Sequence, residues 1–422
     1  MYSLFNTIRS DCSISAVVAG LIAVTVSYAG PLLIVFQAAK IAGLSDSMVS
    51  SWIWAISFST GLAGILLSAW FKVPVITSWS TPGAVLLVSS WSAYAYSDAI
   101  GAFVLSAIIA SILGFSGIFS AVMKRIPQSI IAAMLAGILL KFGVEVFVSL
   151  KQLPILVAPM MLCYLGLKRW YPRYSVPVTL FVGLLIAYNF NLLHFENVSV
   201  SLVHPIFVQP TFSIEALISL GIPLCIVTMT AQNATGIGLL KADGYNPPVS
   251  PIIATTGIAS IIFAPFGAHG INVAAITAAI CTGKEAHTDP DKRYIAGIAC
   301  GIFYVIVSIF GATIASAFSA LPSQLIAAIA GVALFGSLIS SISSAMSDDL
   351  QKESALITFL VTISGISFLG IGAAFWGLIA GIVINFIFTG NLSNYIPSKI
   401  GYSSLNQNIM GYIKNVIEGE VK

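Results

Sequence analysis

Charged side chains are scarce in this chain of 422 residues, because Asp, Glu, Lys and Arg together make up 8% of it, against about 25% in soluble domains. Hydrophobic residues reach 58%, and the mean hydropathy is +0.99. This balance excludes a soluble protein. Apolar runs such as 14–39, 99–123 and 295–317 are long enough to cross a bilayer, which takes about 20 residues. The sequence therefore predicts an all-α polytopic membrane protein surrounded by lipid.

Patterns typical of catalysis and of metal binding are also lacking. The five cysteines are isolated in or beside apolar segments, which argues against a disulfide framework and against a metal site. The motifs H-E-x-x-H and G-x-S-x-G and a glycine-rich phosphate loop do not occur. The net charge of +3 comes from basic residues in loops and does not indicate a nucleic-acid partner. We expect no enzymatic activity and no cofactor.

Polar stretches and Pro/Gly breaks divide the chain into fourteen expected transmembrane spans. They cover residues 14–39, 49–71, 75–95, 99–123, 127–147, 152–167, 175–191, 212–239, 249–264, 266–283, 292–317, 322–343, 353–370 and 373–390. With the N-terminus inside, only Lys40, Lys141 and Lys151 of the 18 basic residues fall outside, in accord with the positive-inside rule. The protein is therefore predicted to lie in the cell inner membrane with both termini on the cytoplasmic side.

The polar stretch 189–210 divides these spans seven and seven, and short sequence matches recur across it at nearly one offset. The matching pairs are 59–63 with 255–259, Pro127 with Pro322, and Lys40-x-x-Gly43 with Lys241-x-x-Gly244. Because seven is odd, the second half must be inverted relative to the first. We predict two inverted repeats, residues 1–195 with spans 1–7 and residues 196–422 with spans 8–14, as in secondary transporters.

The third span of each half is interrupted. Residues 73–84 read VPVITSWSTPGA and residues 264–275 read APFGAHGINVAA. Each stretch predicts extended chain followed by a half-helix that begins near mid-membrane, with Thr81 (before Pro82) and Asn272 as the N-caps. Non-helical backbone cannot face lipid, so these stretches must line a cavity. Interruptions at matching positions indicate the transport site, whereas two merely kinked helices in packing contact would be the structural alternative.

Several side chains near these breaks are candidates for binding. The exposed amide ends of the half-helices suit an anion such as a carboxylate. In the polar patch 228–235, Gln232 is predicted to contact the substrate, and Asn233 either does so or joins helices. His269, the one ionisable residue of the breaks, either carries the proton or bridges backbone groups as a neutral ring. The predicted substrate-binding set is Tyr28, Ser78, Trp79, Ser80, Thr81, Pro82, Gly83, Gln232, Asn233, His269, Gly270, Asn272 and Val273.

Longer motifs resemble the benzoate:proton symporter family from the first span to beyond the tenth. They are Phe36-Gln37-Ala38-Ala39, Ser50-Ser51-Trp52-Ile53-Trp54-Ala55, Trp79-Ser80-Thr81-Pro82-Gly83-Ala84, Arg125-Ile126-Pro127-Gln128, and the run 265–281 followed by Glu285-Ala286-His287. That family is more distantly similar to nucleobase:proton symporters and to sulfate and bicarbonate transporters. The resemblance implies short strands in the third and tenth spans. It also implies a core domain from spans 1–4 and 8–11 that slides, elevator-like, against a gate domain from spans 5–7 and 12–14.

One departure bears on the substrate. The nucleobase carriers place a Glu in the eighth span and another in the tenth, where this chain has Gln232 and the stretch 270–274. Uracil-type recognition is thereby put in doubt, and loss of two carboxylates fits an anionic substrate. We expect proton-coupled uptake of benzoate or a related aromatic carboxylate. A carrier of another small anion or of a nucleobase-like heterocycle, an anion channel and a membrane enzyme are the alternatives, and a homodimer is left open.

Overall fold

The computed structural model describes residues 2–91, 94–119, 121, 127–193, 200–274, 277–284, 286–366, 368 and 373–389, and nearly all of its regular structure is helical. In chain order the elements are α1 (Tyr2–Asp11), α2 (Ile14–Ala29), α3 (Pro31–Ile41), α4 (Asp46–Phe71), β1 (Thr77–Trp79), α5 (Thr81–Ser90), α6 (Tyr96–Phe115), α8 (Gln128–Gln152), α9 (Pro154–Trp170), η2 (Pro172–Tyr174), α10 (Ser175–Asn189), α11 (Ile214–Ala216), η4 (Leu217–Gly221), α12 (Ile222–Val227), η5 (Thr228–Ala234), α13 (Thr235–Ala242), α14 (Val249–Phe263), η6 (Ala264–Phe266), β2 (Ile271–Val273), α15 (Ala278–Thr282), η7 (Pro290–Lys292), α16 (Tyr294–Ile309), α17 (Gly311–Ser319), α18 (Ser323–Ala345), α19 (Lys352–Ser364) and α20 (Ala373–Thr389).

Eight helical stretches within the described residues are long and apolar enough to cross a membrane. They are 14–41, 46–71, 96–115, 128–152, 214–241, 249–266, 290–309 and 323–345, and shorter apolar helices lie at 81–90, 175–189 and 373–388. The chain is thus a helical protein with several candidate spans, as expected. Each of the fourteen expected spans overlaps at least one helix within the described residues, but the first covers both α2 and α3, and the eleventh covers both α16 and α17. The number of spans that cross a membrane stays a prediction.

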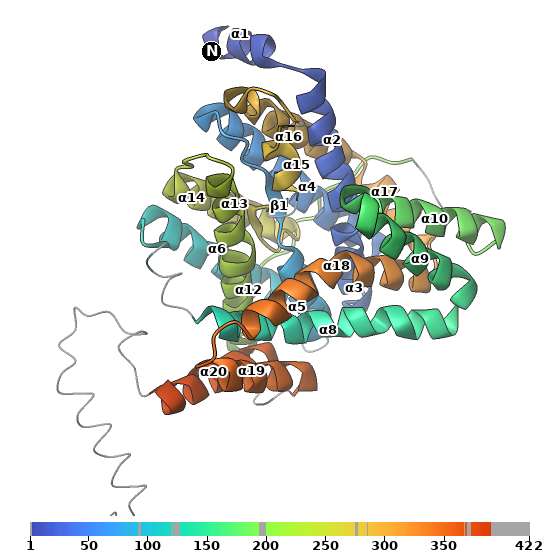
Figure 1. Ribbon diagram of the computed structural model, residues 1–422, viewed down its shortest axis with the longest axis vertical. Coiled ribbons are helices and arrows are strands. Elements are labelled where there is room, and N and C mark those ends of the chain that lie inside the picture. Colours follow the sequence, from blue (N-terminus) through green and yellow to red (C-terminus); the bar gives the residue numbers. More distant parts are fainter. Residues whose placement is uncertain are drawn as a thin grey trace, which may run out of the picture.

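Close helix packing depends on glycine. Helix α4 packs along α16, where a Cβ on Gly61 would lie 2.5 Å from the carbonyl oxygen of Gly301 and a Cβ on Gly301 would lie 2.6 Å from that of Gly61. Helix α6 packs along α14 in a similar way, with Gly114 against the backbone of Ala254. In lipid, small residues at such contacts let two backbones approach closely. These two helix pairs flank the centre of the molecule, where β1 lies (Figure 1).

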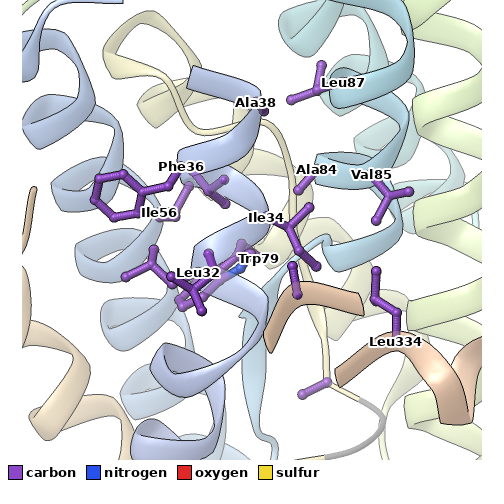
Figure 2. Packing of buried hydrophobic residues seen from close by; sticks show 14 of the residues in the cluster. Leu32, Ile34, Phe36, Ala38, Ile56, Trp79, Ala84, Val85, Leu87 and Leu334 are labelled. Carbon is purple, nitrogen blue, oxygen red and sulfur yellow. The ribbon is translucent and has the colours of Figure 1, made fainter. Parts of the chain in front are cut away.

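A second group of helices packs beside this centre. Helix α8 packs along α18 and α19, α19 packs on α20, and α9 packs on α10, as can be followed below and beside β1 in Figure 1. The group meets the centre through apolar side chains, among them Leu334 of α18, which belongs to the same cluster of buried hydrophobic residues as Val85 of α5 (Figure 2). A Cβ on Gly30, at the break between α2 and α3, would lie 2.8 Å from the Cβ of Ala333.

The two interrupted segments meet in an antiparallel pair of strands. Strand β1 pairs with β2, with Ser78 opposite Asn272 at the middle of the register. The N-cap of the first half-helix is Ser80, one residue before the expected Thr81, because the Ser80 side chain accepts from the amide of Gly83. The expected N-cap at Asn272 is wrong. Asn272 lies within β2, because its backbone pairs with β1, and the following helix α15 begins only at Ala278.

Candidate functional site

Ser80 joins three elements at the start of α5. Its Oγ accepts from the amide of Gly83 at 3.1 Å, and the Thr228 hydroxyl of η5 donates to the same Oγ at 2.9 Å. Its own amide donates to the Gly270 carbonyl at 3.0 Å. A Ser at this position satisfies an otherwise free amide of the first helical turn. The cap therefore fixes α5, η5 and the chain before β2 to one another.

His269 lies in the break before β2 and is fully buried. The indole N–H of Trp52 on α4 donates to its Nδ1 at 3.1 Å, and its Nε2 lies 3.0 Å from the carbonyl oxygen of Ser80. Because an indole nitrogen can only donate, Nδ1 must accept and Nε2 must carry the hydrogen. The ring is then neutral with both nitrogens bonded. This geometry favours the bridging alternative, and the proton-carrying role stays a prediction.

Asn233 and Asn272 hold the strands in place. Asn233 is fully buried, and its Oδ1 accepts from the amide of Val273 at 2.9 Å. With its oxygen and nitrogen exchanged to suit the neighbouring groups, the Asn272 side chain accepts from the Ser80 N–H at 3.0 Å, which it shares with the Gly270 carbonyl, and donates to the Val273 carbonyl at 3.2 Å. For Asn233, expected either to contact substrate or to join helices, the structure thus provides the joining contact. Its segment η5 is π-helical, a distortion that is frequent at functional sites.

Exposure separates the thirteen predicted residues into two groups. The buried group consists of Ser78, Trp79, Ser80, Pro82, Gly83, Asn233, His269, Asn272 and Val273. Tyr28, Thr81, Gln232 and Gly270 are partly exposed. The side chains of Thr81 and Gln232 make no hydrogen bond to any residue that the structure describes. Thr81 and Gln232 thus combine partial exposure with polar groups that bond to no described residue, while the buried group builds the support.

Three aromatic rings gather at β1. The ring of Trp79 contacts that of Tyr28 edge-on, with centroids 5.7 Å apart, and that of Tyr304 on α16 at 5.8 Å. The Tyr28 hydroxyl is bonded to Ser57, and the Tyr304 hydroxyl donates to Ser27 at 2.6 Å. Within the described part of the chain, the Trp79 indole N–H has no partner. Figure 2 shows Trp79 among the apolar side chains of α3.

Sequence reasoning missed three members of this arrangement. Tyr304 lies in an apolar run with no polar pattern to mark it, and Trp52 is 217 residues from the histidine that it contacts. Thr228 belongs to the recognised polar patch, but nothing in its spacing indicates that it meets Ser80. Such pairs arise from the folded arrangement rather than from local sequence.

Charge is scarce at this site. Among the residues that the structure describes, β1, α5, α12, η5, β2 and α15 contain no Asp, Glu, Lys or Arg. The same residues include no cluster of His, Cys, Asp and Glu that could hold a metal ion. The site therefore offers hydrogen bonds and aromatic surface, and no formal charge, to a bound molecule.

Comparison with known proteins shows which family this sequence matches. The profile of the family described as benzoate membrane transport protein matches residues 10–387. The benzoate membrane transport protein of Acinetobacter baylyi is 43% identical over 387 residues, which cover 92% of this chain and 98% of the relative. The inner membrane protein YdcO of Escherichia coli is 41% identical over 373 residues, 87% of this chain and 95% of the relative.

Solved structures share the fold at low sequence identity. The structure of SLC26A9 matches with a TM-score of 0.58 at 15% identity over 89% of this chain, which spans 65% of that longer chain. The transmembrane domain of a cyanobacterial bicarbonate transporter, BicA, matches with a TM-score of 0.53 at 14% identity, over 87% of this chain and 97% of that one. These two likenesses bear on the fold alone.

Proposed function

The chain belongs to the benzoate membrane transport protein family, and we propose that it takes up benzoate or a related aromatic carboxylate together with a proton. The observation that carries this proposal is the pairing of β1 with β2, because it brings both interrupted segments to one place. Partly exposed polar groups border that pairing on separate elements: Thr81 begins α5, and Gln232 lies on η5. Interrupted membrane segments at matching positions are typical of transport sites.

The chemistry of the site suits an aromatic acid. The carboxyl group is proposed to lie near Thr81, Gln232 and Gly270, which are accessible. The ring is proposed to lie against Tyr28, whose own ring contacts Trp79; aromatic pairs of this edge-to-face kind add about 0.5–1.5 kcal/mol to the free energy of apolar burial. The buried predicted residues are proposed to hold these contacts in position, so that their substitution alters binding indirectly.

An elevator-like movement is proposed for the transport step. The proposed core contains the α4–α16 and α6–α14 pairs. In each pair, the second span of one half packs against the fourth span of the other half. Two inverted repeats would relate the pairs to each other in this way. The proposed gate contains α8, α9, α10, α18, α19 and α20. Its contact with the core through residues such as Leu334 and Ala333 is apolar, which leaves few hydrogen bonds to break when one slides on the other.

The proposed location is the inner membrane with both termini cytoplasmic, in line with the basic-residue distribution and with the name of the Escherichia coli relative. Co-transport of one proton with one carboxylate moves no net charge, so the membrane potential, about 2.3 kcal/mol per charge per 100 mV, would not oppose uptake. A homodimer stays a prediction.

Counterflow in proteoliposomes tests the substrate and the transport class together. Purified protein is reconstituted with unlabelled benzoate inside, and labelled benzoate, another aromatic acid, uracil or an inorganic anion is supplied outside. We expect labelled aromatic acids to accumulate unchanged and uracil and bicarbonate not to. Accumulation of an inorganic anion or uracil instead would overturn the substrate assignment. Equilibration without accumulation against a gradient would indicate a channel, and a chemically altered product an enzyme.

A further inference from the structure

Building on the proposed function, we propose that the site binds the aromatic acid in its protonated, neutral form. The side-chain amide of Gln232 pairs with the carboxyl group, so that the co-transported proton travels on the substrate. The observations that carry this inference are a free, accessible amide beside the strand pair and the scarcity of charge around it.

Gln232 lies on η5, which is tied to the start of α5 through Thr228 and Ser80. It lies about one turn after Thr228 in η5, and the Thr228 hydroxyl bonds to Ser80 at the cap of α5. Its neighbour Asn233 is tied to Val273 of β2, so the backbone at Gln232 is fixed on both sides. The Gln232 side chain is partly exposed and makes no hydrogen bond to the described residues. A fixed backbone with a free amide is suited to meeting a ligand.

A primary amide is complementary to a carboxylic acid rather than to a carboxylate. Its carbonyl oxygen accepts from the acid O–H, while its NH₂ group donates to the acid carbonyl, so two hydrogen bonds close a ring. A carboxylate has only acceptor oxygens, so one of them would face the Gln232 carbonyl oxygen without a hydrogen between them. Unpaired polar atoms of this kind are costly in a desolvated site, by about 1–3 kcal/mol each.

The surrounding groups provide little to neutralise an anion. Besides charged residues, the titratable groups on the elements around the strand pair are Tyr28 on α2, Tyr96 on α6, Cys225 on α12, His269, Cys281 on α15, and Tyr294, Cys300 and Tyr304 on α16. Tyr and Cys are neutral at pH 7 by their ordinary values, and the indole N–H of Trp52, which donates to Nδ1, favours the neutral form of His269. Charged residues lie at helix ends, such as Asp46, Asp98 and Lys241. On the neighbouring α8, the side chain of Lys141 is exposed and that of Glu145 is partly exposed.

Backbone amides near the breaks are also largely occupied. At the start of α5, the Gly83 amide donates to Ser80 and Pro82 has no N–H. In and after β2, the amides of Val273 and Ala274 donate to Asn233 and to the Ile76 carbonyl. The cradle of free N–H groups that a carboxylate would need is therefore small at both breaks, which strengthens the case for a neutral ligand.

If the substrate carries the proton, the pH dependence of the apparent KM is set by the pKa of the transported acid. If only the protonated form binds, the apparent KM for total acid rises about tenfold per pH unit above the pKa of that acid. The experiment compares 4-nitrobenzoate, benzoate and 4-methoxybenzoate, in order of falling acidity, with protein-free liposomes to subtract passive entry. We expect the pH at which KM begins to rise to follow that order. One common pH for all three acids would place the proton on the protein and overturn the proposal.

Two further measurements address Gln232 itself. Gln232→Met keeps the size and removes the amide, so we expect the KM for benzoate to rise about tenfold or more. Gln324→Met makes the same change at a partly exposed position of α18, where it removes a hydrogen bond to Gln152 of α8, and should leave KM unchanged. Benzamide, which is neutral at every pH, should inhibit benzoate uptake in the wild-type protein and much less in Gln232→Met. Unchanged KM in Gln232→Met, or no inhibition by benzamide, would overturn the pairing. A protein that accumulates no aromatic acid at any pH would instead refute the proposed function.

Discussion

Trp52 donates its indole N–H to Nδ1 of His269 at 3.1 Å, across 217 positions of sequence, and both side chains are fully buried. The bond fixes the imidazole so that Nε2 can donate to the Ser80 carbonyl on the other interrupted segment. A helix outside the strand pair thus fixes the tautomer of His269, which lies in the break before β2. His269 is, on this geometry, a positioning residue.

The first prediction concerns this histidine. His269→Gln keeps a polar side chain but cannot bond to both Trp52 and Ser80 in the same way, so we expect slower uptake and a lower unfolding temperature. The pH at which KM begins to rise should stay as in the wild-type protein, because the proton is carried elsewhere. Uptake measured from below to well above the pKa of the acid checks this. A pH-independent variant with normal binding would assign the proton to His269.

Trp52→Phe provides the matching half of a double-mutant cycle. It removes the donor to Nδ1 and leaves a buried acceptor unpaired, which should cost about 1–3 kcal/mol of unfolding free energy. In the double variant with His269→Gln, the two losses should not add, since they share one bond. Additive losses in thermal unfolding would show that the bond contributes no coupling.

The second prediction uses two threonines of η5. Thr228→Val removes the hydroxyl that bonds to Ser80, and we expect benzoate KM to rise several-fold because α5 is no longer tied to η5. Thr230→Val is the control, since its hydroxyl is also buried but bonds only to the Ile226 carbonyl of its own helix. Equal KM in the two variants would contradict a special role for the contact between Thr228 and Ser80.

The sequence predicted the interruptions well and their internal geometry less well. Pro82 and the glycines at 267 and 270 are local signals, and they correctly indicated where the helices break. The N-cap at Asn272 was wrong because its backbone pairs with β1 and its side chain bonds to Ser80, a contact that only the strand pairing creates. The short strands came from the family resemblance, since strands of three residues have no reliable local pattern.

For the candidate site residues, too, the sequence identified residue types, and only the structure shows their contacts. Residue type alone marked Gln232 and Asn233 as polar groups in a membrane helix, but it could not tell which of them faces β2. The structure separates them, because Asn233 bonds to Val273 while the Gln232 amide remains free. Contacts such as Trp79 with Tyr304 depend on long-range packing, which the sequence pattern does not encode.

The third prediction tests the joining contact of Asn233. Asn233→Leu leaves the buried amide of Val273 without an acceptor, which should cost about 1–3 kcal/mol of unfolding free energy and weaken the pairing of β2. We expect a lower unfolding temperature together with loss of benzoate uptake. Asn189→Leu, at an exposed helix end, is the control. Normal stability with selective loss of uptake would indicate that Asn233 contacts the substrate directly.

The fourth prediction concerns the close contact between α4 and α16. Gly61→Val would place a Cβ 2.5 Å from the Gly301 carbonyl oxygen, so the two helices must separate. Overpacking of this kind typically costs about 1–3 kcal/mol, and backbone against backbone leaves little room to adjust. Thermal unfolding in detergent should show the loss, along with lower uptake, because α4 also holds Trp52. Gly238→Ala, where a Cβ would meet no atom within 4 Å, should leave both measurements unchanged. If Gly61→Val unfolded at the wild-type temperature, the α4–α16 contact could not be as close as described, and the position of Trp52 relative to His269 would lose its support.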